Sequence, residues 1–401
     1  MDNIILNSNI NKKLGYYVCD NLEFDSKIQA CMHAVQVKKP VVWIFNNSIF
    51  NSYDWTVEPE HDLDYYYNLR ARQIREQYDY VVLSYSGGAD SHNVYEAFRR
   101  QHLHIDEIIV NNVERAGKSL LDESSSRAFD SLASEYKQQI LPRLQEITKQ
   151  VPKTKITIAD QSDTLFQTFE LAGDASWVLD KRECVHPANV TRFNYLHFNE
   201  IRKRFDKNYR IALVLGIEKP RTIIYRSELL MRFADRVANM ITAAEHLKHY
   251  TNSTVEYFYW SPDCVPLLIK QGHVIKRWLE NNPTQQMNWY VENSTAESYR
   301  IYQEPMLRSI IYTTWNQTWF QAEKSTFDWY SEFDQFFQVG YSDSRAYHIW
   351  KEGLNYLEKN LQPFLRKSDI LNKVDGFMPA LHHYNLGKIK NINPDINVWI
   401  R

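Results

Sequence analysis

Short apolar runs alternate with stretches of helical periodicity through the middle of the chain. Four of these runs have the length of a buried strand, at 80–85, 107–113, 155–158 and 211–215. Apolar residues at helical spacing follow the first two runs, and another helix is expected between the third and the fourth. Strands that alternate with helices predict a parallel sheet covered on both faces, which is a three-layer α/β/α fold.

The pattern divides the chain into three regions. Residues 1–78 predict an N-terminal α/β extension, with strands and helices expected at 16–18, 27–37, 41–45 and 63–77. Residues 79–281 form the central domain, whose last elements are expected to be a strand at 255–260 and a helix at 263–281. Residues 282–401 are rich in Tyr and Trp and have weaker periodicity, so we expect a mostly helical C-terminal region.

Glycine is scarce, and two adjacent glycines lie directly after the first central strand. The chain has 11 glycines, and this pair stands in the string Ser86-Gly87-Gly88-Ala89-Asp90-Ser91. Small residues allow a tight turn that points several N–H groups into one concavity, at a helix N-terminus whose dipole favours an anion. The two serine hydroxyls add donors, and Asp90 is suited to a hydrated Mg²⁺ that also binds phosphate oxygens. The string predicts a pyrophosphate site; the competing interpretation is a strand-to-helix turn with a serine cap.

The string SGGADS after a hydrophobic strand resembles the SGGxDS signature of the PP-loop ATP pyrophosphatase superfamily, which has the adenine nucleotide alpha-hydrolase-like fold. The resemblance covers roughly residues 79–281, as a PP-loop nucleotide-binding domain. The extension and the segments YFYWSPDC and KQGHVIKRW are also similar to virus-encoded members of the phosphoadenosine phosphosulfate (PAPS) reductase-like branch. The resemblance implies chemistry with ATP and Mg²⁺, in which an acceptor oxygen attacks the α-phosphorus, pyrophosphate leaves and a nucleophile displaces AMP.

The resemblance also implies which residues contact the nucleotide. The residues that match the pyrophosphate loop are Ser86, Gly87, Gly88, Asp90 and Ser91. Asp90 is expected to be both the metal ligand and a catalytic residue. The family binds adenine at the end of the second strand, which places Asn111, Asn112 and Val113 beside the base, mostly through backbone groups.

A second cluster follows the fourth strand, in the segment Leu215-Gly216-Ile217-Glu218-Lys219-Pro220-Arg221. Because ligands bind at the carboxyl ends of parallel strands, we expect this loop to face the same crevice. Gly216 would permit close backbone approach, while Lys219 and Arg221 would neutralise charge on the leaving group as catalytic residues. The pattern is similar to the Gly-x-x-basic stretch of the reductase-like branch; the alternative is a solvated basic loop.

Other suggestive residues are expected to have ordinary roles. The string GKS at 117–119 ends like a Walker A loop, but the position five residues before Gly117 is Asn112 rather than glycine. Some Cys and His residues invite a metal interpretation without supplying four ligands at a recognisable spacing, namely Cys184, His186, His382 and His383.

Departures from the family leave three functional hypotheses open. The chain lacks the Glu-Cys-Gly-Leu-His segment of sulfonucleotide reductases, and it has Asp2 where glutamine-dependent members carry a cysteine. The first hypothesis is an AMP-forming enzyme that adenylylates an acceptor oxygen of a small-molecule or nucleobase-containing substrate for amidation, thiolation or ligation. The second is a sulfonucleotide (PAPS) reductase-like or sulfur-transfer enzyme that uses Cys184 or Cys264. The third is a non-catalytic nucleotide-binding interaction protein whose aromatic C-terminal region binds a partner.

Charge and composition limit the partners and the compartment. With 47 Lys+Arg against 49 Asp+Glu, the formal net charge of −2 does not indicate nucleic acid as a partner. The four cysteines form no CxxC pair, and no apolar stretch approaches the ~20 residues of a membrane span. We therefore expect a cytoplasmic protein, in the host cytoplasm if it is virus-encoded, without membrane insertion. The oligomeric state stays open.

Overall fold

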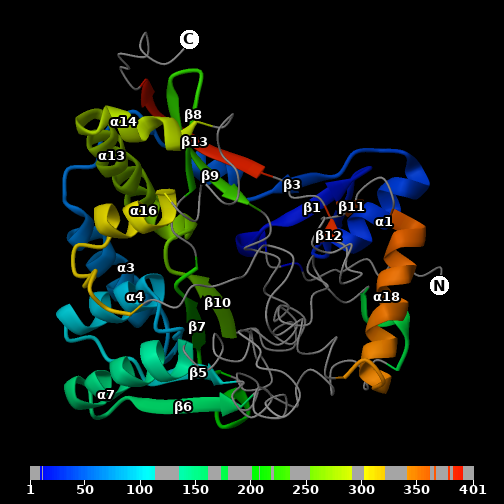
Figure 1. Ribbon diagram of the computed structural model, residues 1–401, viewed down its shortest axis with the longest axis horizontal. Coiled ribbons are helices and arrows are strands. Elements are labelled where there is room, and N and C mark those ends of the chain that lie inside the picture. The colour runs from blue at the N-terminus through cyan, green and yellow to red at the C-terminus, as the bar shows by residue number, and fades with distance from the viewer. Residues whose placement is uncertain are drawn as a thin grey trace.

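A computed structural model places most of the chain, and Figure 1 shows the arrangement of its elements. The structure describes residues 10, 12–112, 135–160, 173–178, 201–206, 208–217, 221–234, 253–290, 302–320, 341–361, 365–366, 378–379 and 383–391. Their strands form one parallel sheet and three antiparallel sheets. The parallel sheet carries the candidate site.

The parallel sheet has five strands in the order β10-β7-β4-β5-β6. Their bounds are Tyr80–Ser84 (β4), Glu107–Asn112 (β5), Lys155–Asp160 (β6), Ile211–Leu215 (β7) and Ser253–Tyr257 (β10). All five strands expected in the central domain are therefore confirmed as members of one sheet. Strand β7 is buried at every position, as its apolar sequence IALVL requires.

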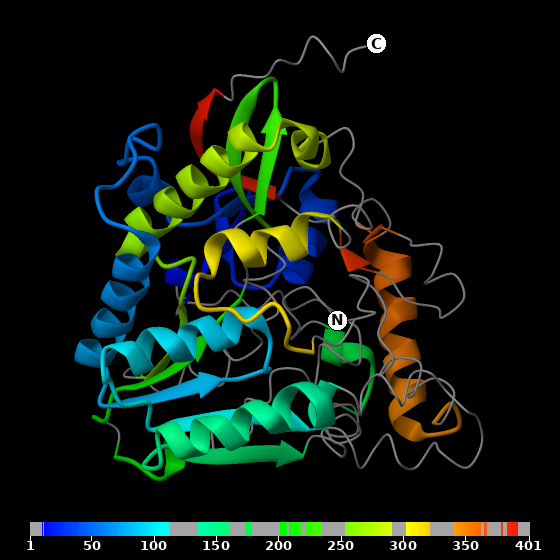
Figure 2. The same ribbon diagram turned by 60° about the vertical axis from the view of Figure 1, so that its left-hand side comes forward.

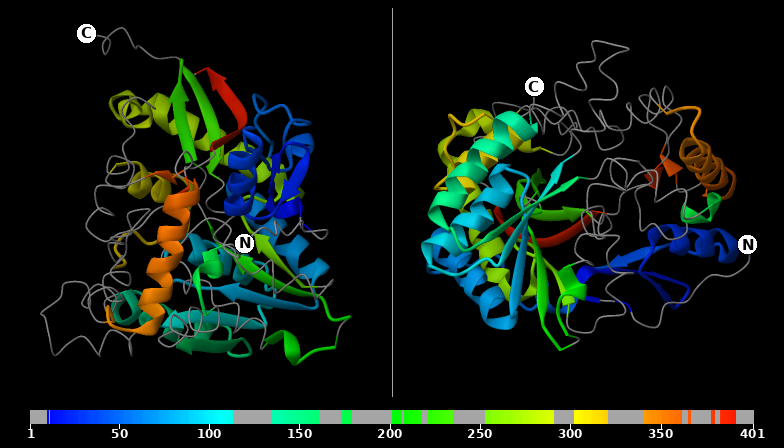
Figure 3. Two further views of the ribbon diagram at one scale, coloured as in Figure 1. Left: turned by 90° about the vertical axis from the view of Figure 1, so that its right-hand side faces the viewer. Right: turned by 90° about the horizontal axis from the view of Figure 1, so that it is seen from below.

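Three helices lie together on one side of this sheet (Figure 3). They are α3 (Leu63–Gln77), α4 (Ala89–Arg100) and α7 (Leu141–Gln150). The π-helical segment η2 (Glu135–Ile140) leads directly into α7, and Pro142 lies in the first turn of that helix. A mixed α/β class with a parallel sheet is thus confirmed, while the three-layer arrangement stays a prediction.

The strand order reverses beside β4. The chain continues from β4 to β5 and β6 on one side, whereas β7 and β10 are added on the other side. At such a switch point the loops that follow two neighbouring strands diverge and leave a crevice in which ligands bind. The two strands here are β4 and β7, whose last residues Ser84 and Leu215 are paired in register.

The N-terminal region forms a small antiparallel sheet of its own. Its strands, in the order β2-β1-β3, are β1 (Tyr16–Cys19), β2 (Leu22–Phe24) and β3 (Val42–Ile44). Helix α1 (Lys27–Val37) begins after Ser26, whose hydroxyl accepts a hydrogen bond from the Gln29 N–H, and it packs on β1. The short elements of this region are η1 (Lys12–Leu14) and α2 (Asn47–Phe50).

A second antiparallel sheet corrects the sequence analysis. Its strands are β8 (Arg221–Tyr225), β9 (Glu228–Ala234) and β13 (His383–Asn391), in the order β13-β9-β8. The turn residues Arg226 and Ser227 have φ of 48° and 62°, as a two-residue hairpin turn requires. The segment 215–221 was expected to be a loop, and residues 282–401 were expected to be mostly helical. Strand β13 was missed because its partner β9 lies about 150 positions away in the chain. The β8–β9 hairpin is local, and it was missed because its turn residues Arg226 and Ser227 are not the Asn-Gly or Asp-Gly pair typical of such turns.

The remaining helices pack on different parts of the molecule. Helix α13 (Val265–Asn281), expected at 263–281, contacts α3 and α16 (Glu304–Ile311), whereas α18 (Arg345–Leu361) contacts α1 and η3 (Ala175–Val178). The shorter elements are η4 (Pro262–Cys264), α14 (Pro283–Gln286), η5 (Met287–Trp289), β11 (Leu365–Arg366) and β12 (Met378–Pro379). No helix within the described ranges has the length and hydropathy needed to cross a membrane.

Candidate functional site

The turn between β4 and α4 places the string at 86–91 at the carboxyl end of the sheet. Gly87 has a φ of +69°, in the left-handed region, and Gly88 directly precedes the first residue of α4. A Cβ at position 87 would lie 2.9 Å from Cγ1 and 3.2 Å from Cα of Ile140. Position 87 therefore requires glycine both for its backbone conformation and for the close approach of η2.

Both serine hydroxyls of the string form hydrogen bonds within the turn. The Ser86 N–H donates to Ser91 Oγ at 3.2 Å, and the Ser91 hydroxyl donates to the Gly88 carbonyl at 3.2 Å. The Gly88 N–H donates to Ser86 Oγ at 3.4 Å. Helix geometry leaves the first N–H groups of α4 without intrahelical acceptors, and the dipole there favours negative charge. The serines thus shape the turn, and the helix N-terminus provides its affinity for anions.

Asp90 lies in the first turn of α4, half-buried between two tyrosines. The Tyr312 hydroxyl donates to Asp90 Oδ1 at 2.7 Å, and the Tyr259 hydroxyl donates to the Asp90 carbonyl at 2.8 Å. Burial raises the pKa of both phenols, so that both stay protonated donors. The carboxylate is therefore oriented by a residue 222 positions away in the chain.

Gly216 lies against the same turn of α4. A Cβ at this position would lie 2.9 Å from Ser91 Cα and 3.0 Å from the Asp90 carbonyl carbon. The structure thus brings together the loops that follow β4 and β7. Arg221 occupies the first position of β8, opposite Arg232, whose pKa is lowered by burial and then by the charge of Arg221. Lys219 lies outside the described residues.

The carboxyl end of β5 adjoins the start of the string. The Tyr85 N–H donates to the Ile109 carbonyl at 2.9 Å, which continues the pairing of β4 with β5. Asn111 and Asn112 are the last residues of β5, and Asn112 is half-buried. Val113 lies outside the described residues. Binding of adenine at this strand end stays a prediction.

A charged side chain that the sequence analysis did not single out lies over the turn. Arg143 of α7 donates to the Gly87 carbonyl, and the Gln139 amide donates to the Ser86 carbonyl at 3.1 Å. A second Arg143 nitrogen donates to the Phe320 carbonyl at 2.9 Å. Arg143 is only 5% exposed, and burial lowers the pKa of its guanidinium.

Two tryptophans hold this guanidinium. Its Cζ lies 4.9 Å from the ring centroids of both Trp315 and Trp319, which meet each other edge to face. His92 contacts both indoles edge-on, and its Nδ1 shares a 2.9 Å hydrogen bond with the Tyr85 hydroxyl. Burial lowers the pKa of His92 to about 4, so this ring adds no charge at neutral pH. Figure 2 shows the segment after α16 running past α4 toward α7.

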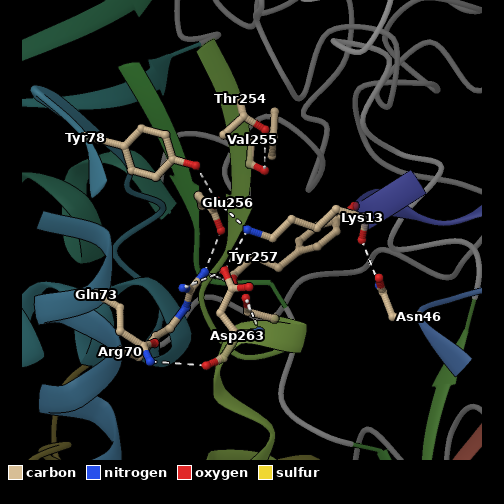
Figure 4. Close-up of polar contacts among 11 residues, drawn as sticks. Lys13, Asn46, Arg70, Gln73, Tyr78, Thr254, Val255, Glu256, Tyr257 and Asp263 are labelled. Carbon is tan, nitrogen blue, oxygen red and sulfur yellow. Dashed lines mark hydrogen bonds and ion pairs between the residues drawn. The ribbon is translucent and has the colours of Figure 1, made fainter. Parts of the chain in front are cut away.

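A second polar cluster joins the N-terminal extension to the edge strand β10 (Figure 4). The fully buried Glu256 accepts hydrogen bonds from three side chains, namely Arg70 (2.5 Å), Tyr78 (2.5 Å) and Lys13 (2.8 Å). Burial opposes the charged form, but Arg70 and Lys13 outweigh it, so the pKa of Glu256 lies below its usual value. The Asp263 carboxylate adds an ion pair with Lys13 at 2.8 Å. Opposite charges thus meet within this cluster, which suits a structural role.

Cys264 lies next to this cluster and is buried. It is 2% exposed, and burial raises the pKa of its thiol, which is the reverse of what a nucleophilic thiolate requires. In the ranges that the structure covers, no group of three or more His, Cys, Asp or Glu side chains could hold a metal ion. The other residues that invited a metal or Walker A interpretation lie outside the described residues, namely 117–119, Cys184, His186 and His382. The backbone of His383 is described, but its side chain is not.

No protein-family model matches this chain, and no curated protein does. The resemblance to PP-loop enzymes therefore depends on the string at 86–91 and on its place between a buried parallel strand and a helix.

Arg143, Tyr312 and the two tryptophans were missed because their contacts with the turn connect distant parts of the chain. One signal for Arg143 is present in the sequence. It shares a helix face with Ile140, Leu144 and Ile147, so it is a charged residue within a buried apolar stripe. The aromatic residues carry no such signal, because Tyr and Trp are abundant throughout the C-terminal region.

Proposed function

We propose that this protein is a PP-loop ATP pyrophosphatase, an enzyme that cleaves ATP to AMP and pyrophosphate and adenylylates an acceptor oxygen. The observation that carries the proposal is the position of the string at 86–91. It lies at the switch point of a parallel sheet, with Gly216 from the neighbouring loop packed against its helix. The adenine nucleotide alpha-hydrolase-like arrangement of three layers belongs to the same proposal.

Each part of the site has a role in this reaction. The N–H groups at the start of α4 bind the β- and γ-phosphates, and the backbone at Asn111 and Asn112 binds adenine. The acceptor oxygen attacks the α-phosphorus, and the bond to the departing pyrophosphate breaks. Negative charge on the pyrophosphate is stabilised by the helix N-terminus, with Lys219 and Arg221 as further cations. A nucleophile then attacks the adenylylated acceptor and displaces AMP, which completes amidation, thiolation or ligation.

The residues fit a magnesium ion that binds together with the nucleotide. Mg²⁺ in nucleotide sites commonly takes one or two carboxylates and completes its octahedron with phosphate oxygens and water. Asp90 supplies one carboxylate at the edge of the turn, and Tyr312 fixes its orientation. When bound there, the ion would neutralise phosphate charge.

The two other hypotheses receive less support from the geometry. A sulfur-transfer or reductase-like reaction needs an accessible thiolate, and Cys264 is buried with a raised pKa, while Cys184 lies outside the described residues. A non-catalytic nucleotide-binding protein would use the same turn and differ only in the fate of ATP. The experiment must therefore measure binding and pyrophosphate release separately.

The test measures pyrophosphate release from ATP·Mg²⁺ with a panel of carboxylate, amide and nucleobase acceptors. We expect the wild type to release pyrophosphate and Asp90→Asn to lose about 10²- to 10³-fold in rate, since a group that stabilises charge in the transition state is removed. Asp343→Asn, at an exposed aspartate in the turn before α18, is the matched control and should retain the rate. ATP binding without release across the panel would favour the non-catalytic hypothesis, and absence of ATP binding would contradict the proposal.

A further inference from the structure

Arg143 carries a buried positive charge, and its neighbours are neutral. Both hydrogen bonds of its guanidinium go to backbone carbonyls, those of Gly87 and Phe320. The Arg143 Cζ lies over the indole rings of both Trp315 and Trp319. Within the part of the chain that the structure describes, no carboxylate forms an ion pair with Arg143.

This environment is unfavourable for the protein by itself. A buried cation loses the stabilisation of water, and only a nearby anion restores most of it. Carbonyl dipoles and indole faces recover a part, yet the pKa of Arg143 is still lowered by burial. An anion bound next to the guanidinium would supply the missing charge.

The guanidinium lies where such an anion is expected. The guanidinium donates to the carbonyl of Gly87, and only Gly88 lies between Gly87 and the first residue of α4. An anion bound to the first N–H groups of α4 would therefore lie beside the guanidinium. An arginine has five N–H donors in a planar fork that matches the oxygens of a phosphate. Its two protein hydrogen bonds leave further donors for a ligand.

We propose that Arg143 binds the pyrophosphate part of the nucleotide, and that Trp315 and Trp319 hold its guanidinium in position. This inference rests on the proposed function and adds to it a cation from α7. It also gives the segment at 312–320 a role in the nucleotide site. That segment orients Asp90 through Tyr312 and encloses Arg143 through the two tryptophans.

The experiment is a calorimetric titration of the full chain with inorganic pyrophosphate and Mg²⁺. Arg143→Gln removes the charge and keeps an amide donor, and we expect its affinity for pyrophosphate to fall about 10- to 100-fold, as for the loss of a charge-assisted hydrogen bond. Lys149→Gln is the matched control, because Lys149 is exposed on the same helix and the charge change is the same. It should bind pyrophosphate like the wild type.

Thermal unfolding without ligand separates a binding role from a structural one. Because the fold does not need the charge, Arg143→Gln and Arg143→Met should unfold no earlier than the wild type and should lose most of the stabilisation by pyrophosphate. Wild-type affinity in both variants overturns the proposal. Failure of both to fold overturns it too, since the fold would then require the cation. If the wild type itself binds neither ATP nor pyrophosphate, it is the proposed function that fails.

Discussion

Arg70 and Arg143 are both buried, but their charges are neutralised in different ways. The Arg70 guanidinium is fully buried and lies 2.5 Å from the Glu256 carboxylate and 3.6 Å from that of Asp263. The Arg143 guanidinium, at 5% exposure, is in contact with carbonyls and indoles. Arg70 belongs to α3 and Arg143 belongs to α7, two helices on the same side of the parallel sheet. Burial alone therefore does not distinguish the two arginines.

The difference separates a charge that carboxylates of the fold neutralise from a charge that, in our proposal, a ligand neutralises. The ion pairs of Glu256 join α3, β10 and the residues around η1, so they form when the chain folds. Arg143 adjoins a turn that favours anions, and its counter-charge would arrive with the nucleotide. The comparison gives a general criterion: a buried cation without a carboxylate, beside a helix N-terminus, is a candidate ligand contact.

The largest expected effect is on stability and concerns the ion pairs that Glu256 forms with Arg70 and Lys13. Glu256→Gln should lower the free energy of unfolding by about 3–5 kcal/mol, because the buried Arg70 and the nearby Lys13 lose their shared partner. Denaturant unfolding measures the change, with Glu23→Gln as the control at an exposed ion pair. If Glu256→Gln were tolerated while Arg143→Gln unfolded the protein, the assignment of the two arginines would be reversed.

An intermediate effect is expected where the turn beside Arg143 meets the neighbouring loop. Gly216→Ala should destabilise the fold by about 1–3 kcal/mol and weaken pyrophosphate binding, because its Cβ would lie within about 3 Å of the backbone of Asp90 and Ser91. Unfolding and pyrophosphate titration measure both effects. Gly216→Val should be worse than Gly216→Ala. Equal stability of the three proteins would mean that the loops are not in close contact.

A smaller effect concerns the pH dependence of stability, through His92, which contacts the same two tryptophans as Arg143. The folded pKa of His92 is lowered to about 4, from about 6.5 in an unfolded chain, so only the unfolded state takes up this proton as pH falls below 6.5. Stability from this group is therefore present above pH 6.5 and is lost toward pH 4. Between pH 7 and pH 5 the wild type should lose about 2 kcal/mol more than His92→Asn. Parallel pH profiles of the two proteins would show that His92 is not buried as described.

The parallel sheet and its turn could be predicted because their signals are local. Apolar runs of strand length mark β4, β5, β6 and β7, and each joins the sheet in a parallel register. The string at 86–91 combines small residues, a helix start and Asp90 within six positions, so its signal lies in a short stretch of sequence. The hairpin that begins at Arg221 was missed because its turn residues Arg226 and Ser227 lack the Asn-Gly or Asp-Gly signal of a two-residue turn. The pairing of β13 with β9 was missed because these strands lie about 150 positions apart.

The chain's own sequence determines that a glycine turn follows a buried strand and opens a helix, since sterics at Gly87 and the periodicity of the flanking residues act over a few positions. Only the tertiary structure decides which groups surround that turn. Tyr312 reaches Asp90 across 222 positions, and Arg143 reaches Phe320 across 177. Such contacts form when distant apolar surfaces pack together. The burial that results removes the Arg143 guanidinium from water, so that a nearby anion would stabilise its charge.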